Sequence, residues 1–214
     1  MNIKRFPLGP LWTNGYLVWD SDGRGFFVDP GGPMGEVIEF IKNANIGLEM
    51  VLLTHGHSDH IFGLEEIRPL AKKGVGIHEL DAPLLEKPEL NLSAFLSKPC
   101  AAKPAEQKLQ DGQVLEIGSM RVEVIHTPGH TRGSCCLMAN DEDEAILLSG
   151  DTLFAQSIGR TDLPGGDQRE LECSLKKLAR LKDDMQVFPG HGPDTTIGAE
   201  RINNPFWPME KERP

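Results

Sequence analysis

Short apolar runs separated by glycine, proline and aspartate recur along the first half of the chain. Runs over residues 3–7, 13–19 and 25–28 are rich in residues that favour strands, and they predict an antiparallel meander. A turn-forming break at 29–33 leads into 35–44, where apolar residues recur at helical spacing. The other elements predicted in this half are buried strands at 50–53 and 74–77, an amphipathic helix at 61–73, and a short helix with Asp81 as its N-cap.

The second half repeats this alternation after an irregular segment, 88–104, that is rich in proline. We interpret that segment as a long surface crossing between the two halves, and long crossings of this kind often cover a site. Strands are predicted at 114–117, 120–126, 133–138, 145–149 and 185–189, and helices at 169–181, with Asp167 as N-cap, and at 198–204. The acidic turn N-D-E-D at 140–143 predicts a solvated hairpin tip, because it lacks the ligand spacing of a calcium loop. Two sheets packed face to face with helices outside would bury all of these strands.

Residues 54–60, T-H-G-H-S-D-H, place three imidazoles and a carboxylate directly after a buried strand. A strand-to-helix loop is where an α/β sheet usually presents its working groups. Histidine and aspartate supply the nitrogen and oxygen ligands of zinc, iron and manganese. A solvated polar loop without metal is the alternative, but short motifs rarely reach this density of ligand-type residues by chance. The loop therefore predicts a metal site.

Three later strands end in the same way, with a glycine and one ligand-type side chain. His130 follows Pro128-Gly129, Asp151 follows Gly150, and His191 follows Gly190. A lone histidine in any of these places would more often be structural, but four such endings, counting the loop at 54–60, favour a shared centre. The candidate ligands are His55, His57, Asp59, His60, His130, Asp151 and His191, which are too many for one tetrahedral ion and fit two ions with a bridging carboxylate. His78 is interpreted as structural. His126 is interpreted either as structural or as a residue that hydrogen-bonds to a metal ligand.

Composition and charge indicate the class of protein and exclude some kinds of binding partner. The chain has 214 residues, 39% hydrophobic and 25% charged, as expected of one soluble globular domain spanning residues 1–214. A net charge of −10 argues against nucleic acid as substrate or partner. No apolar run approaches the length of a membrane span and no export signal is visible, so a cytoplasmic protein that does not bind membranes is expected, as a monomer or small homo-oligomer. The four cysteines, with no CxxC pair, are expected to be reduced and mostly buried.

The ordered set of ligand-type residues resembles that of the metallo-β-lactamase superfamily. The phrases T-P-G-H-T at 127–131, G-D-T-L-F at 150–154 and P-G-H-G-P at 189–193 are similar to those of its glyoxalase II-type branch. The resemblance implies an α/β fold, an αββα sandwich of two mixed β-sheets flanked by helices. It also implies that His55, His57 and His130 hold one divalent metal ion, and that Asp59, His60 and His191 hold a second. Asp151 would bridge the two ions together with a water or hydroxide.

On this resemblance we expect a hydrolase acting on a small-molecule thioester, such as S-lactoylglutathione or a relative. Zinc is the first choice of metal, with iron or manganese as options, and Asp59 would orient the hydroxide as a catalytic residue. The chain is expected to depart from the full glyoxalase II pattern: we expect no C-terminal helical extension of the kind that grips glutathione, and Tyr16 is the only tyrosine in the sequence. Arg160 stands where those enzymes have a lysine and is a candidate for binding a substrate carboxylate, with a pair to Asp162 or Asp167 as the alternative.

Four other functions remain as rivals. A mononuclear iron persulfide dioxygenase would use His55, His130 and Asp151, and the phrase at 189–193 disfavours it because it resembles the hydrolase form. A true β-lactamase is disfavoured because those enzymes lack the bridging Asp151. A nucleic-acid-processing enzyme is disfavoured by the charge, and a non-enzymatic binding module would leave a complete site idle.

Overall fold

The computed structural model describes residues 1–141 and 144–208, which fold into two six-stranded mixed sheets. The first sheet has the order β1-β2-β3-β4-β5-β6 and the second β14-β13-β10-β9-β8-β7. The first sheet comprises β1 (Asn2–Leu8), β2 (Thr13–Trp19), β3 (Arg24–Val28), β4 (Gly47–Leu53), β5 (Val75–His78) and β6 (Gln107–Leu109). The second comprises β7 (Val114–Ile117), β8 (Met120–His126), β9 (Cys135–Asn140), β10 (Ala145–Gly150), β13 (Gln186–Pro189) and β14 (Thr195–Thr196), and β11 (Leu153–Phe154) pairs separately with β12 (Ser157–Ile158).

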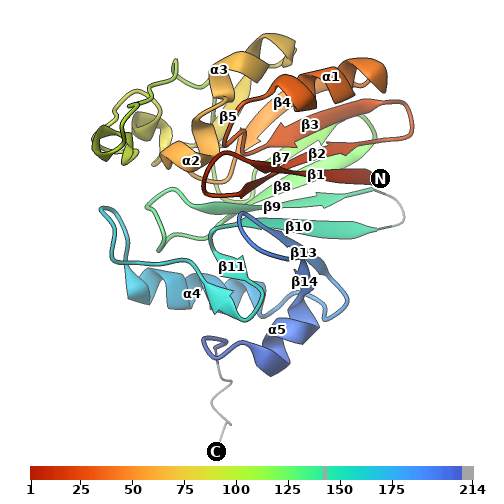
Figure 1. Cartoon of the computed structure of the whole chain (residues 1–214). Helices are drawn as coiled ribbons and strands as arrows, with labels where there is room; N and C mark the ends of the chain where they lie inside the picture. Colours follow the sequence, from red (N-terminus) through yellow and green to blue (C-terminus); the bar gives the residue numbers. More distant parts are fainter. Residues whose placement is uncertain (142–143, 209–214) are drawn as a thin grey trace, which may run out of the picture.

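Helices cover the outer face of each sheet, which confirms the predicted αββα sandwich (Figure 1). Those over the first sheet are α1 (Gly35–Asn43), α2 (Ser58–Ile61) and α3 (Leu64–Ile67), and those over the second are α4 (Gln168–Leu178) and α5 (Ile197–Asn203). Short 3-10 turns are η1 (Arg68–Leu70), η2 (Ala82–Leu84) and η3 (Ser93–Phe95). No helix within the described residues is long and apolar enough to cross a membrane.

Strand alternation divides the apolar side chains into three layers of core. On β4, Met50 and Leu52 point between the two sheets, whereas Val51 and Leu53 point toward the helices of the first sheet. The adjacent Cys135 and Cys136 of β9 divide in the same way, one between the sheets and one under α4. All four cysteines are free, with Cys173 exposed on α4. Because the central strands are buried on both faces, their sequences are nearly continuous apolar runs rather than an alternation of apolar and polar residues.

Several predicted elements need correction. The helix expected over 61–73 is three short pieces, because the chain turns at Gly63, where an added Cβ would lie 2.0 Å from the carbonyl oxygen of Gly32, and Pro69 then ends the regular α-helix. The short strands β6, β11, β12 and β14 were not predicted, since two or three residues carry no periodic pattern. Asp167 caps α4 as predicted, accepting hydrogen bonds from two backbone N–H groups. Asp81 makes no side-chain cap. Part of the acidic turn, 142–143, lies outside the described residues.

Candidate metal centre

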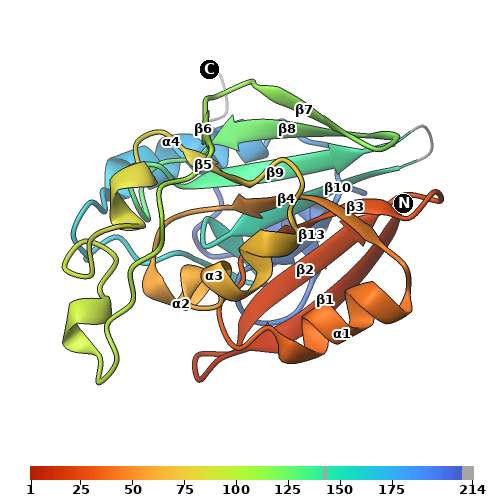
Figure 2. The ribbon, with the colours of Figure 1, turned by 90° about the horizontal axis from the view of Figure 1, so that it is seen from above.

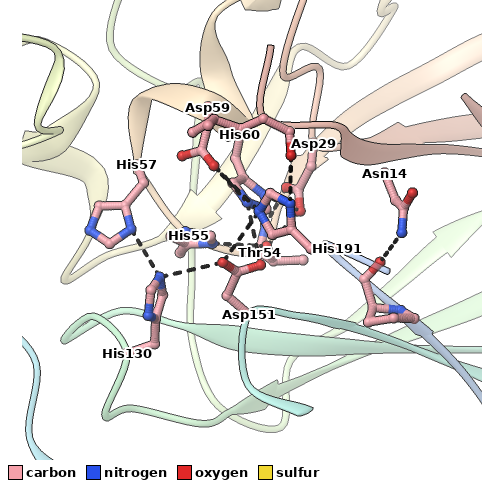
Figure 3. Close-up of polar contacts among 12 residues, drawn as sticks. Asn14, Asp29, Thr54, His55, His57, Asp59, His60, His130, Asp151 and His191 are labelled. Carbon is pink, nitrogen blue, oxygen red and sulfur yellow. Dashed lines mark hydrogen bonds and ion pairs between the residues drawn. The ribbon is translucent and has the colours of Figure 1, made fainter. Parts of the chain in front are cut away.

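The loop after β4 and the strand ends of the second sheet meet at one edge of the sandwich. His55 and His57 lie in the loop itself, while Asp59 and His60 lie in the first turn of α2. On the facing sheet, His130 follows β8, Asp151 follows β10 and His191 follows β13. The structure thus brings together all seven candidate ligands from both sheets (Figure 3).

Two glycines allow the facing loops to approach this closely. Gly150 has a positive φ of 49°, and a Cβ there would lie 2.4 Å from Thr54 Oγ1. At Gly190 a Cβ would lie 2.3 Å from Asp151 Oδ1 and 2.8 Å from His60 Cε1. A side chain at Gly150 would displace Thr54, which precedes His55, and a side chain at Gly190 would displace two candidate ligands.

The candidate ligands form three overlapping groups: the two implied by the resemblance, and a third of His55, His60 and Asp151 that connects them. In one of the two implied groups, His55, His57 and His130 have ligand atoms within 4.8 Å of one another, and in the other Asp59, His60 and His191 do so. Asp151 lies between them, with Oδ2 3.7 Å from His130 Nε2 and 3.6 Å from His191 Nε2, and Oδ1 3.4 Å from His60 Nε2. This is the position that a carboxylate shared by two ions would take. The assignment of each residue as a ligand stays a prediction.

The ring nitrogens that face away from the cluster have protein partners. Nδ1 of His60 lies 2.9 Å from Asp29 Oδ2, and Nδ1 of His130 lies 2.8 Å from the carbonyl oxygen of Arg160. Nδ1 of His191 lies 3.2 Å from the carbonyl oxygen of Leu11. Donation of the Nδ1 proton to these acceptors leaves Nε2 with a free lone pair aimed into the cluster, the arrangement usual for metal-binding histidine.

Buried polar atoms in the cluster lack hydrogen-bond partners among the described residues. They include Nε2 of His55 and of His60, and Oδ1 of Asp151. In addition, Nδ1 of His57 lies only 2.9 Å from Nε2 of His130, so two ring nitrogens of different loops point toward each other. A buried polar atom without a partner is costly, and a cation bound among these atoms would satisfy them. The residues therefore fit divalent metal ions.

The pKa values in the cluster favour ionised carboxylates. Burial alone would raise the pKa of Asp59 and of Asp151, but the facing imidazoles outweigh burial and hold both below the usual range. Burial, followed by the charge of His130, lowers the pKa of His57 to about 3. Both carboxylates and the His57 ring are therefore in the deprotonated form that metal binding requires at neutral pH. Burial alone would lower the pKa of His60 and of His191, but the facing carboxylates raise both, so a metal ion would have to displace a proton from each of these two rings.

Two buried aspartates that support the cluster were not identified from the sequence. Asp29 accepts hydrogen bonds from the backbone N–H and the hydroxyl of Thr54 as well as facing His60. Asp81 accepts from the N–H of Gly56, the hydroxyl of Thr131 and the N–H of Gly133, and so it joins the loop of His55 to the loop of His130. Each follows a strand, at Asp29-Pro30 and at His78–Asp81, and that position was the available signal.

The remaining predicted residues lie outside the cluster. The Arg160 side chain is 61% exposed and pairs with Asp162 through two 2.7 Å hydrogen bonds, so the alternative pairing is present in the structure. Its substrate-binding role stays a prediction, whereas its carbonyl orients His130. The rings of His78 and His126 stack with centroids 4.0 Å apart, and His126 Nε2 lies 2.9 Å from the carbonyl oxygen of Arg132 in the His130 loop.

Comparison with known proteins agrees with this geometry. The family described as the metallo-β-lactamase superfamily matches residues 8–191. The hydroxyacylglutathione hydrolase GloC of Haemophilus influenzae is 35% identical, with 96% of this chain and 98% of that protein aligned. The solved B3 metallo-β-lactamase BLEG-1 is 41% identical, with a TM-score of 0.90 over 96% of this chain and 99% of that chain. TTHA1623, solved in a di-iron-bound form, is 35% identical with a TM-score of 0.81 over 95% and 99% of the two chains.

Proposed function

The chain belongs to the metallo-β-lactamase superfamily, and we propose that it is a thioester hydrolase of the glyoxalase II type that uses two divalent metal ions. The observation that carries the proposal is the pair of three-residue groups with Asp151 between them. A site for one ion would need only one of these groups, so the second supports a dinuclear hydrolase over a mononuclear iron dioxygenase. The similarity to GloC supports a thioester as the substrate.

When bound, two such ions would lower the pKa of a shared water and polarise a carbonyl oxygen. Asp59 would accept a hydrogen bond from the attacking water and orient it toward the carbonyl carbon. Its carboxylate is suited to this, because its low pKa keeps it ionised and its side chain is 22% exposed at the mouth of the cluster. His60 and His191 hold Asp59 in place, with the Nε2 of His191 3.4 Å from Asp59 Oδ2.

A thioester suits this site because a thiolate leaves without protonation by a strong general acid. Tyr16, the only tyrosine in the chain, is not available as such an acid. It is buried, its hydroxyl donates to the carbonyl of Pro189, and burial raises the pKa of that hydroxyl well above its usual range. Zinc is our first proposal for the metal, and the similarity to a protein solved with two iron ions supports iron as the second.

Metal analysis combined with a substrate panel tests the proposal. Protein purified without added metal is expected to hold two divalent ions per chain and to hydrolyse S-lactoylglutathione or simpler thioesters. The Asp59→Ala variant should lose at least about a hundredfold in kcat/KM while keeping its circular dichroism spectrum. Asp22→Ala, which removes an exposed carboxylate on a distant turn, is the matched control.

The same panel tests the rival reactions. One iron per chain with oxygen uptake on glutathione persulfide would replace the hydrolase by a dioxygenase. Turnover of a chromogenic cephalosporin in the absence of thioester turnover would favour a β-lactamase, a reading supported by the similarity to BLEG-1. Full thioesterase activity in Asp59→Ala would remove Asp59 from the proposed role.

A further inference from the structure

A pocket of about 370 Å³ opens beside Asp59. Four segments of the chain form it: the β1–β2 hairpin tip, residues 31–33 before α1, the start of α2 together with Phe62, and residues 96–98 after η3. In two views the hairpin tip and the segment around η3 lie on either side of α2 (Figures 1 and 2). The walls are mainly apolar, with side chains of Pro10, Leu11, Pro33, Phe62 and Leu96.

The pocket is continuous with the Asp59–His60–His191 group. Asp59 lines it directly, and Leu11 lines it with its side chain while its carbonyl oxygen faces Nδ1 of His191. A substrate whose carbonyl carbon lies next to Asp59 therefore has its neighbouring atoms at the mouth of this pocket. The same hairpin residue positions a candidate ligand and forms a pocket wall.

Three large apolar side chains of the lining are exposed to solvent. Leu11 is 61% exposed, Leu96 is 50% and Phe62 is 36%. Such a cluster of apolar side chains beside a catalytic site is costly in water, and an apolar ligand group between them would bury it. Polar carriers such as glutathione do not match these walls, so the acyl part of a thioester is the better occupant.

A positively charged side chain, that of Lys98, lies at the edge of the pocket. The ammonium of Lys98 lies 5.6 Å from the ring centroid of Phe62, and it makes no ion pair within residues 1–141 and 144–208. Arg160, by contrast, is already bound to a carboxylate of its own chain. Lys98 can therefore meet an anionic group of the substrate without first breaking an internal ion pair.

We infer that this pocket binds an apolar acyl group, and that Lys98 meets an anionic group on the thiol carrier. The substrate class is then thioesters of medium-length or aromatic carboxylic acids on anionic thiols, in preference to short hydroxyacyl thioesters. This inference rests on the proposed thioester hydrolysis, because only then does the acyl group lie beside Asp59.

An acyl series on one constant thiol tests the acyl part. Each methylene buried in the pocket should raise kcat/KM roughly fourfold until the pocket is filled, from about 0.8 kcal/mol per methylene. Leu96→Ser should flatten this dependence. Phe95→Ser is the matched control, since Phe95 is 83% exposed but does not line the pocket, and it should leave the dependence unchanged. The inference would be overturned if kcat/KM did not change with acyl length, or if it changed with the length of the thiol instead.

Binding of alkanesulfonates, followed by calorimetry on the metal-loaded protein, separates this inference from the proposed reaction. These probes carry an apolar chain and an anion but no hydrolysable bond. Affinity should rise with chain length, and Lys98→Gln should weaken it by up to about fivefold at low salt, whereas Lys87→Gln should not. Chain-dependent binding without thioester turnover would retain the pocket and reject the thioesterase. Thioester turnover together with no chain-dependent binding would reject the pocket alone.

Discussion

Asp29→Asn should weaken metal binding without unfolding the protein. Asp29 has a positive φ of 53°, a conformation that asparagine tolerates, so the change adds no backbone strain. The asparagine oxygen can still accept from the Thr54 N–H, whose nitrogen lies 2.9 Å from Asp29 Oδ1. Its amide nitrogen then replaces Oδ2 and donates toward Nδ1 of His60. The ring proton of His60 must move to Nε2, the atom aimed into the cluster.

Loss of an orienting partner of this kind typically costs 10- to 100-fold in metal affinity, or about 1.4–2.7 kcal/mol. Affinity is measured by competition with a chromophoric chelator, and the stability of the metal-free protein by urea unfolding. Asp20→Asn is the matched control, because Asp20 is equally buried and accepts three backbone N–H bonds far from the histidines. Metal affinity within about twofold of the unmodified protein in Asp29→Asn, or an equal loss in Asp20→Asn, would refute the reasoning.

Three further substitutions probe other parts of the structure. Gly190→Ala should lower metal affinity about tenfold or more in the same competition assay, because the added Cβ would lie 2.3 Å from Asp151 Oδ1. Gly35→Ala is the control and should have no effect, because no atom lies within 4 Å of the added Cβ. Burial, followed by the neighbouring His126 ring, lowers the pKa of His78 to about 4, so the unfolded chain binds more protons and stability should fall as pH drops from about 6.5 toward 4. His78→Gln should flatten that part of the profile in urea unfolding of metal-free protein. Arg160→Ala should raise KM for anionic thioesters by up to about fivefold, and an equal rise for neutral esters would remove Arg160 from substrate binding.

The predictable part of the site was its list of candidate ligands. They stand in four segments that each follow an apolar strand, and the recurrence of this pattern indicated that they share one site. Gly150 and Gly190 stand next to candidate ligands in the sequence, and glycine at such a position indicates that another part of the backbone approaches closely. The layered fold followed from apolar alternation together with the resemblance to a known family.

The position of Asp29 and Asp81 after strands was a signal, but their supporting roles could not be predicted, because these roles depend on contacts between distant segments. Asp81 was interpreted as a helix cap from its neighbours in the sequence. Its carboxylate instead accepts hydrogen bonds from the backbone N–H groups of Gly56 and Gly133, which are 25 and 52 positions away. Lys98 lies in a segment without periodicity, and only the folded chain places it beside Phe62. The break at Gly63 has the same origin, since its close neighbour is the backbone of Gly32.

The candidate ligands also join the two sheets. His55 and His57 come from the first sheet and His130 from the second, while Asp59 and His60 come from the first and His191 from the second. Direct hydrogen bonds already cross at this edge: the N–H of Cys135 donates to the carbonyl of Thr54, and the N–H of Asn14 donates to the carbonyl of Gly190. These backbone bonds connect the two halves of each group without involving the side chains of the candidate ligands. The folded backbone therefore contributes to bringing the five imidazoles together, and the metal ions need not supply the whole of that cost.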